Sequence, residues 1–201
     1  MRRGAALRAF WHVFPAAPTL CIYHANHAPP TFWVFIAAIA WSLFEIYRLT
    51  RPEFNERLLR AAGDGLRRAE ASRPTGTCFY LWGVATTLYM FTPDAAVAGI
   101  LCLALADPAA AIVGQSLGRW RGPSLRDGKS CGGFAAAWAV ASFAVALHAI
   151  TLRGSQEGRV WAAPAVGLCA ALAESYSVLV DDNLALPVLS AACAGQWLVG
   201  E

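Results

Sequence analysis

Apolar residues gather in seven long runs that short polar stretches separate. The runs cover residues 10–24, 31–49, 76–92, 95–118, 133–152, 160–180 and 184–199. A helix needs roughly 20 apolar residues to cross the hydrocarbon core of a bilayer. The pattern therefore predicts an all-α transmembrane helix bundle of about seven segments. Six segments are the alternative, because the first run is short and contains Pro15 and Pro18, and the last run is also marginal.

The composition agrees with a membrane protein and excludes an ordinary soluble domain. The chain is 57% hydrophobic and only 14% charged, whereas soluble domains carry about 25% charged residues. We expect residues 1–201 to form one integral membrane domain. The six cysteines are scattered, mostly inside apolar runs, and form no C-x-x-C pair, so they are interpreted as small buried hydrophobes.

The basic residues are distributed asymmetrically about the predicted segments. If the N-terminus is cytoplasmic, every lysine and arginine except Arg153 and Arg159 lies on the cytoplasmic side, as the positive-inside rule requires. The arginine-rich stretch at about 50–74 is predicted to be a cytoplasmic interfacial segment, with a solvated loop as the alternative. Glu45 and Arg48 close the segment before it and are expected to form a local ion pair or an interfacial anchor.

Asp107 interrupts the apolar run 95–118. A carboxylate at bilayer depth is costly and usually marks an ion, proton or substrate site. Asp is a good N-cap and Pro is favoured at the next position, so Asp107-Pro108 predicts a broken segment with a new half-helix starting at Pro108. Such a helix N-terminus suits phosphate. The alternative is a kink at which Asp107 only caps the backbone.

The chain's only lysine, Lys129, lies between Gly128 and Ser130. Lysine binds phosphate as a point charge, and nearby glycines let backbone N–H groups surround an anion. Taken alone, however, a lysine at a helix end is usually a topology determinant. Gly114 and Gly118 follow Asp107 at helical spacing, which indicates close helix packing and also room for a nucleotide.

Glu174 is a second acid inside an apolar run, and Asp182-Asn183 opens the last run. Carboxylates that converge on a basic loop suit Mg²⁺-dependent phosphoryl transfer. We therefore expect Asp107 to lie within about two helix turns, ~11 Å, of Lys129 or Asp182. An ordinary polar turn is the alternative for residues 181–183.

Three motifs, with weaker matches upstream, carry a family resemblance over nearly the whole chain. They are Asp107-Pro-Ala-Ala-Ala-Ile-Val-Gly-Gln-Ser-Leu-Gly118, Gly128-Lys-Ser-x-x-Gly133, and Glu174 with Asp182-Asn-Leu-Ala-Leu-Pro187. The upstream matches are Arg8…His12, Phe54-Asn55, Arg68-x-Glu70 and Thr75-Gly-Thr77 with Gly83. This set resembles the CTP-dependent lipid kinases, which include polyprenol, phytol and diacylglycerol kinases and are related to phosphatidate cytidylyltransferases. Gly132 departs from the pattern, since many members carry an acid there.

The resemblance implies a membrane enzyme that transfers the γ-phosphate of CTP to a lipid alcohol with the help of Mg²⁺. The implied catalytic residues are Asp107, Lys129, Glu174 and Asp182, of which Asp107 and Asp182 would hold Mg²⁺ and Glu174 would act as a base or second ligand. Nucleotide and phosphate binding would fall to Pro108, Gly114, Gly118, Gly128, Ser130, Gly133 and Asn183. Weaker candidates for the lipid headgroup are His12, Arg68 and Glu70.

Two other functions stay open at this point. Phosphatidate cytidylyltransferase uses the same nucleotide, metal and lipid surface, and a non-enzymatic membrane protein or small transporter would use the acids for ions or protons. The expected partners are a membrane lipid and a nucleotide, with no nucleic acid and no predicted oligomeric state. The alanine- and arginine-rich composition favours a bacterial inner membrane over an ER or plastid membrane.

Overall fold

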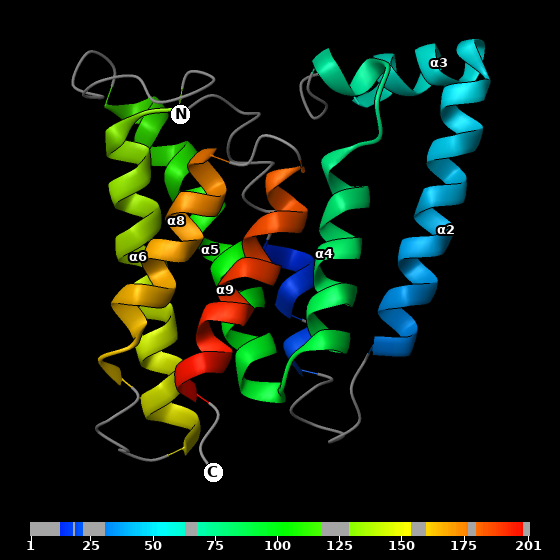
Figure 1. Ribbon diagram of the computed structural model, residues 1–201. Helices are drawn as coiled ribbons and strands as arrows, with labels where there is room; N and C mark the ends of the chain where they lie inside the picture. The colour runs from blue at the N-terminus through cyan, green and yellow to red at the C-terminus, as the bar shows by residue number, and fades with distance from the viewer. Residues whose placement is uncertain are drawn as a thin grey trace.

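The computed structural model describes residues 13–17, 19–21, 31–62, 68–117, 129–153, 160–176 and 180–198. Every regular element among them is a helix, which confirms the all-α prediction (Figure 1). The elements are α2 (Thr31–Thr50), α3 (Pro52–Ala62), η2 (Arg68–Ala71), α4 (Gly76–Met90), α5 (Pro93–Ser116), α6 (Cys131–Arg153), α8 (Ala163–Tyr176) and α9 (Asp182–Leu198). Short helical stretches at 13–17 and 19–21 precede them.

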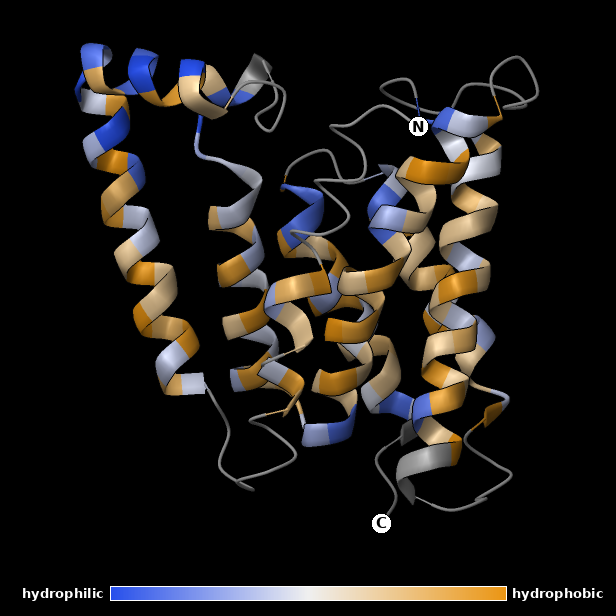
Figure 2. Ribbon diagram, turned by 180° about the vertical axis from the view of Figure 1, so that it is seen from behind, coloured by the Kyte–Doolittle hydropathy of each residue, from blue (hydrophilic) through white to orange (hydrophobic). Residues whose placement is uncertain are grey.

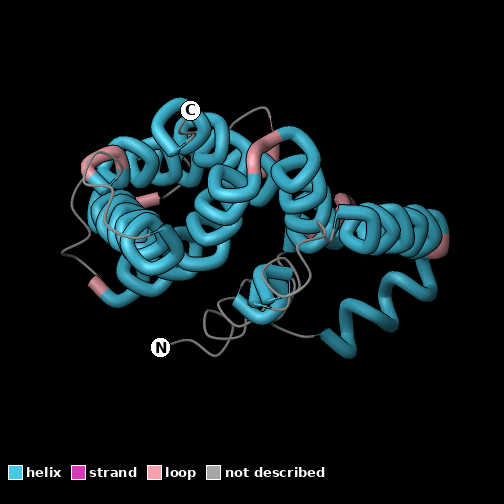
Figure 3. Tube along the Cα trace, turned by 90° about the horizontal axis from the view of Figure 1, so that it is seen from below, coloured by secondary structure: helices cyan, strands magenta, loops and turns pink. Residues whose placement is uncertain are grey.

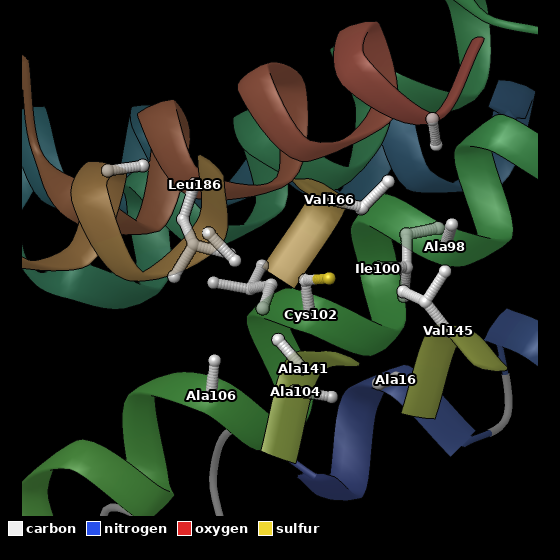
Figure 4. Packing of buried hydrophobic residues seen from close by; sticks show 14 of the residues in the cluster. Ala16, Ala98, Ile100, Cys102, Ala104, Ala106, Ala141, Val145, Val166 and Leu186 are labelled. Carbon is white, nitrogen blue, oxygen red and sulfur yellow. The ribbon is translucent and has the colours of Figure 1, made fainter. Parts of the chain in front are cut away.

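Helix α5 is the centre of the bundle. It packs against α4, α6, α8 and α9, while α2 lies at the edge against α4, as the view along the helices shows (Figure 3). The core is built mainly from small side chains on several helices (Figure 4). Those labelled in the close-up are Ala16, Ala98, Ile100, Cys102, Ala104, Ala106, Ala141, Val145, Val166 and Leu186.

Glycines allow the central helices to touch backbone to backbone. A β-carbon on Gly99 of α5 would collide with the carbonyl oxygen of Pro187 on α9. One on Gly167 of α8 would collide with Ser142 of α6. Close approach at small residues is how helices associate where the surrounding lipid is as apolar as the side chains. Helices α5, α6, α8 and α9 are therefore fixed against one another with little room for larger side chains.

Helix α5 is continuous through Asp107-Pro108, so the predicted break at this point is wrong. Pro108 lies inside the helix and is buried. It removes one backbone hydrogen bond, the one to the carbonyl of Ala104, whereas a new helix start would leave up to four N–H groups to be satisfied in apolar surroundings. The helix begins instead at Pro93, directly after Thr92, where Pro occupies the first turn.

Within the described residues, three helices are long and apolar enough to cross a membrane: α2, α5, and residues Cys131–Ile150 of α6. Helices α4, α8 and α9 have 15, 14 and 17 residues, fewer than the roughly 20 that a spanning helix needs. Apolar residues dominate the bundle helices, whereas α3 is mostly hydrophilic (Figure 2). The membrane character predicted from the apolar runs is therefore supported, and the count of seven segments stays a prediction.

Helix α3 lies across the end of α2, at the same end of the bundle as the starts of α6 and α9 (Figure 1). Arg57 and Arg60 on it are exposed. Phe54 packs on Phe44 and Tyr47 of α2, with ring centroids 6.2 and 5.3 Å apart. The predicted interfacial segment thus contains a helix, and Phe54 anchors it to α2.

Candidate active site

Three carboxylates from three helices meet inside the bundle. Asp107 on α5, Glu174 in the last turn of α8 and Asp182 at the start of α9 each offer an oxygen, and these oxygens lie within 4.8 Å of one another. Helices α8 and α9 are short, and the end of α8 and the start of α9 lie below the level of α3 (Figure 1). Their acids can therefore meet Asp107 inside the bundle. The proximity expected between Asp107 and Asp182 is therefore present.

Lys129 binds two of these acids. Its ammonium nitrogen Nζ lies 3.0 Å from Oε1 of Glu174 and 3.0 Å from Oδ2 of Asp182. It also donates to the backbone carbonyl of Glu174, close to the end of α8, where free carbonyls favour a cation. The side chain of Lys129 is 29% exposed, whereas those of Glu174 and Asp182 are 8% and 13% exposed. The lysine thus stands between the acids and the solvent.

The charge of Lys129 is stabilised by its surroundings. Burial alone would lower the pKa of the ammonium, but the charges of Asp182 and Glu174 and their hydrogen bonds outweigh burial and raise the pKa above its ordinary value. Lys129 is therefore a permanent cation near neutral pH. It offsets part of the repulsion among carboxylates that would otherwise favour uptake of protons.

Two helix starts flank the acids, and the side chain of the residue just before each helix caps it. The Gly133 N–H donates to Oγ of Ser130 over 3.1 Å at the start of α6, and the Asn183 N–H donates to Oδ1 of Asp181 over 3.0 Å at the start of α9. These are N-caps. The helix starts near the acids are therefore those of α6 and α9, and no helix begins at Pro108 to bind phosphate as predicted.

Gly114 and Gly133 bring α5 and α6 together beside this cap. A β-carbon on Gly133 would lie 3.0 Å from the carbonyl oxygen of Ala110, and one on Gly114 would lie 3.1 Å from Oγ of Ser130. The structure thus gives Gly114, Ser130 and Gly133 packing and capping roles. Their predicted binding of phosphate stays a prediction.

Asn183 orients Asp182. Its side chain is only 3% exposed, and its Nδ2 donates to Oδ1 of Asp181 over 2.8 Å and to Oδ1 of Asp182 over 3.3 Å. Asp182 therefore has one oxygen held by Asn183 and the other by Lys129. Asn183 was predicted to bind nucleotide, and what the structure shows is contact with the two acids.

Ser175 was missed by the sequence analysis. Its Oγ donates to Oε2 of Glu174 over 2.8 Å, and its side chain is almost completely buried. Because Lys129 holds Oε1, both oxygens of Glu174 are fixed. A serine directly after an acid in an apolar run was the signal that could have indicated it.

A second polar cluster, which we call the Arg48 cluster, ties α2 and α3 to the segment before α4. Arg48 is fully buried. A guanidinium has five N–H donors, and five hydrogen bonds satisfy them. The acceptors are Oε2 of Glu45 (from Nε and Nη2), Oδ1 of Asn55, and the carbonyls of Glu70 and Arg73. The predicted ion pair between Glu45 and Arg48 is confirmed, at 2.6 Å.

Other predicted residues lie away from the acids or outside the described part of the chain. His12, Gly118 and Gly128 are outside it, as is the side chain of Arg68, whose backbone opens η2. Oε1 of Glu70 accepts a hydrogen bond of 2.8 Å from the Gly76 N–H at the start of α4. Glu70 is thus placed at a helix start.

The carboxylate cluster fits a magnesium ion. Mg²⁺ prefers carboxylate oxygens in octahedral geometry at about 2.1 Å, so opposite ligands lie about 4.2 Å apart. The oxygens of Asp107, Glu174 and Asp182, all within 4.8 Å of one another, need only small movements to match this spacing. Counted formally, three carboxylates and one ammonium carry a net charge of −2, which a divalent cation would balance.

Comparison with known proteins gives two curated relatives. A CTP-dependent diacylglycerol kinase of Saccharomyces cerevisiae is 25% identical over 190 residues, which covers 84% of this chain and 63% of the yeast protein. A CTP-dependent diacylglycerol kinase of Eremothecium gossypii is 27% identical over 167 residues, which covers 74% of this chain and 52% of that protein. The chain thus spans less than two thirds of the length of either.

No family model matches the chain, and no solved structure matches it. Both relatives are fungal, so they give no support to the predicted bacterial inner membrane, which stays a prediction. The similarity extends over most of the chain and is not limited to the short motifs around Asp107 and Lys129. The predicted resemblance to the CTP-dependent lipid kinases is therefore confirmed by overall sequence similarity.

Proposed function

We propose that this protein is a membrane kinase that transfers the γ-phosphoryl group of CTP to the hydroxyl of a membrane lipid, with a diacylglycerol as the preferred acceptor. The observation that carries the proposal is the meeting of Asp107, Glu174 and Asp182 around the ammonium of Lys129. Similarity to two proteins named CTP-dependent diacylglycerol kinase supports the choice of donor and acceptor.

Each charged group of the site has a place in this reaction. Asp107 and Asp182 would hold Mg²⁺, which when bound would neutralise charge on the phosphate oxygens. Lys129 turns from the carboxylates to the phosphates, and the start of α6 adds the N–H groups of a helix N-terminus. This movement releases Oε1 of Glu174, which accepts the proton of the lipid hydroxyl while the hydroxyl oxygen takes the phosphoryl group. CDP leaves with the electrons of the broken P–O bond.

The proposed membrane orientation follows from the arginines. The N-terminus and the arginine-rich segment around α3 face the cytoplasm, because nearly all basic residues then lie on that side. The partly exposed side chain of Lys129 faces this same cytoplasmic side, where the nucleotide is dissolved. The chain acts as one membrane domain, and the lipid keeps its acyl chains in the bilayer while its hydroxyl reacts.

Purified protein in lipid–detergent micelles with γ-³²P-CTP, Mg²⁺ and a panel of diacylglycerol, polyprenol and phytol tests the proposal. We expect label in the lipid product, most of all with diacylglycerol. Parallel reactions with phosphatidate separate the alternative: formation of CDP-lipid with label only in pyrophosphate would identify a cytidylyltransferase. An absence of CTP turnover with every acceptor would overturn the kinase proposal and favour a transporter of ions or protons.

A further inference from the structure

The Arg48 cluster lies on a continuous path of contacts to the carboxylates. Arg48 fixes segment 70–76, which runs from η2 to the first residue of α4, by donating hydrogen bonds to the carbonyls of Glu70 and Arg73. Oγ1 of Thr75 also donates to Oε1 of Glu45 over 2.6 Å. Four residues of α2 and α3 thus fix this short segment: Trp41, Glu45, Arg48 and Asn55.

The end of this segment touches Asn183. The Gly76 N–H donates to Oε1 of Glu70, and a β-carbon on Gly76 would lie 3.1 Å from Nδ2 of Asn183 and 3.5 Å from Oε1 of Glu70. About two turns further along the same face of α4, a β-carbon on Gly83 would collide with the carbonyl oxygen of Asn183. Helix α4 therefore packs closely against both the side chain and the backbone of Asn183.

Asn183 connects α4 to the carboxylate cluster. Its Nδ2 donates to Oδ1 of Asp182, whose other oxygen binds Lys129. The amide is nearly inaccessible to solvent, so no water can replace its contacts without a rearrangement. A shift of a few tenths of an ångström at Gly76 would move the side chain of Asn183, and this side chain contacts the carboxylate of Asp182 directly.

We propose that Arg48 and Gly76 are positioning residues of the kinase site: Arg48 fixes segment 70–76, which sets Asn183 and thereby Asp182. The proposal rests on the function proposed above for Asp182, but its structural part can be measured without turnover. Neither residue touches the reacting atoms. Arg48 belongs to α2, which packs on α4, whereas the carboxylates lie on α5, α8 and α9, and the contacts described above connect the two groups.

Gly76→Ala is the sharpest test, because alanine favours a helix more than glycine does. The variant is expected to fold at least as well as the parent while its β-carbon displaces Nδ2 of Asn183. Gly195→Ala is the matched control, since a β-carbon there would meet its nearest neighbour only at 3.9 Å. Arg48→Gln tests the other end of the path, with Arg60→Gln as its control, an exposed arginine on α3.

Two readouts separate positioning from folding. Binding of Mn²⁺ to the purified protein, followed by electron paramagnetic resonance, is expected to weaken about tenfold in Gly76→Ala and Arg48→Gln, and kcat is expected to fall about tenfold with KM for CTP nearly unchanged. Both controls should match the parent. Hydrogen exchange of the peptide that covers the first two turns of α9 should also become faster in the two test variants.

The outcomes are distinguishable. Unchanged exchange in α9 for both test variants would overturn the positioning proposal, whatever the activity. Faster exchange in α9 together with no CTP turnover by the parent protein would leave the structural path standing and overturn the kinase function. Loss of kcat in proportion to a loss of folded protein, with normal Mn²⁺ binding by the folded fraction, would show a purely structural role.

Discussion

The ammonium nitrogen of Lys129 lies 3.0 Å from a carboxylate oxygen of Asp182, although 53 positions separate the two residues in the chain. This contact joins the start of α6 to the start of α9. It places the chain's only lysine where it can compensate the acids and, in the proposed reaction, bind phosphate.

Replacing Lys129 by methionine is expected to lower phosphoryl transfer roughly a hundredfold, on the scale of one lost electrostatic contact in an active site. Methionine keeps a similar length but removes the charge. Transfer of label from γ-³²P-CTP to lipid measures the effect. Arg60→Gln removes an exposed cation and should have near-normal activity. Equal activity of Lys129→Met and the parent would remove Lys129 from the site.

Asp107→Asn and Asp182→Asn are each expected to reduce turnover roughly a hundredfold and to raise the Mg²⁺ concentration needed for half-maximal activity. The amide keeps the shape of the carboxylate but carries no charge, so it binds a hard cation poorly. Asp94→Asn, in the first turn of α5, is the matched control in the same helix as Asp107. A normal Mg²⁺ dependence in both site variants would argue against metal binding at these acids.

The raised pKa of Lys129 predicts an ammonium that does not titrate in the physiological range. Because the pKa in the folded protein lies above the ordinary value of about 10.4, the stabilisation by Lys129 is complete below that value. It is lost only as the pH rises through the folded pKa. The protein has one lysine, so ¹³C-lysine labelling should give one lysine signal, with a chemical shift that is constant between pH 7 and 9. A titration within this range would contradict the assignment.

Arg48→Lys is expected to destabilise the protein by about 2 kcal/mol or more, although it conserves the charge. A lysine has three donors in place of five, so at least two hydrogen bonds of the Arg48 cluster are lost, each worth about 1 kcal/mol or more. Denaturation of the purified protein in mild detergent measures the change. Stability equal to that of the parent would mean that the carbonyls of Glu70 and Arg73 find other donors.

Gly167→Ala is expected to destabilise the bundle by about 1–3 kcal/mol, the usual cost of overpacking. The new β-carbon would press on both the side chain and the backbone of Ser142, so α6 and α8 would have to separate. Gly195→Ala, which has ordinary van der Waals room, is expected to cost nothing. Thermal denaturation of the two variants side by side measures the difference, and equal melting temperatures would contradict the close contact.

The sequence was informative where a single local pattern decides the structure. Apolar runs located α2, α4, α5, α6, α8 and α9, and acids inside apolar runs singled out Asp107 and Glu174. The same reasoning applied to Glu45 and Arg48 predicted their ion pair. It could not show that Asn55 and the carbonyls near Glu70 complete the cluster, because those contacts depend on how α3 folds back.

The error at Asp107-Pro108 has a physical cause. Asp followed by Pro is a local signal for a helix start, but inside α5 the packing of neighbouring helices decides, and one missing hydrogen bond costs less than an open end. The contact between Gly76 and Asn183 was also beyond local patterns. It depends on which helices face each other, and helical spacing alone does not determine that.

The unbroken course of α5 has a consequence for how the site can vary. Asp107 lies nine residues before the helix ends at Ser116, which at 1.5 Å per residue is about 14 Å along the helix axis. The continuous helix α5 alone sets this distance between Asp107 and the helix end, independently of any loop. Exchange of the connecting loops between related proteins would therefore leave the position of this carboxylate along α5 unchanged.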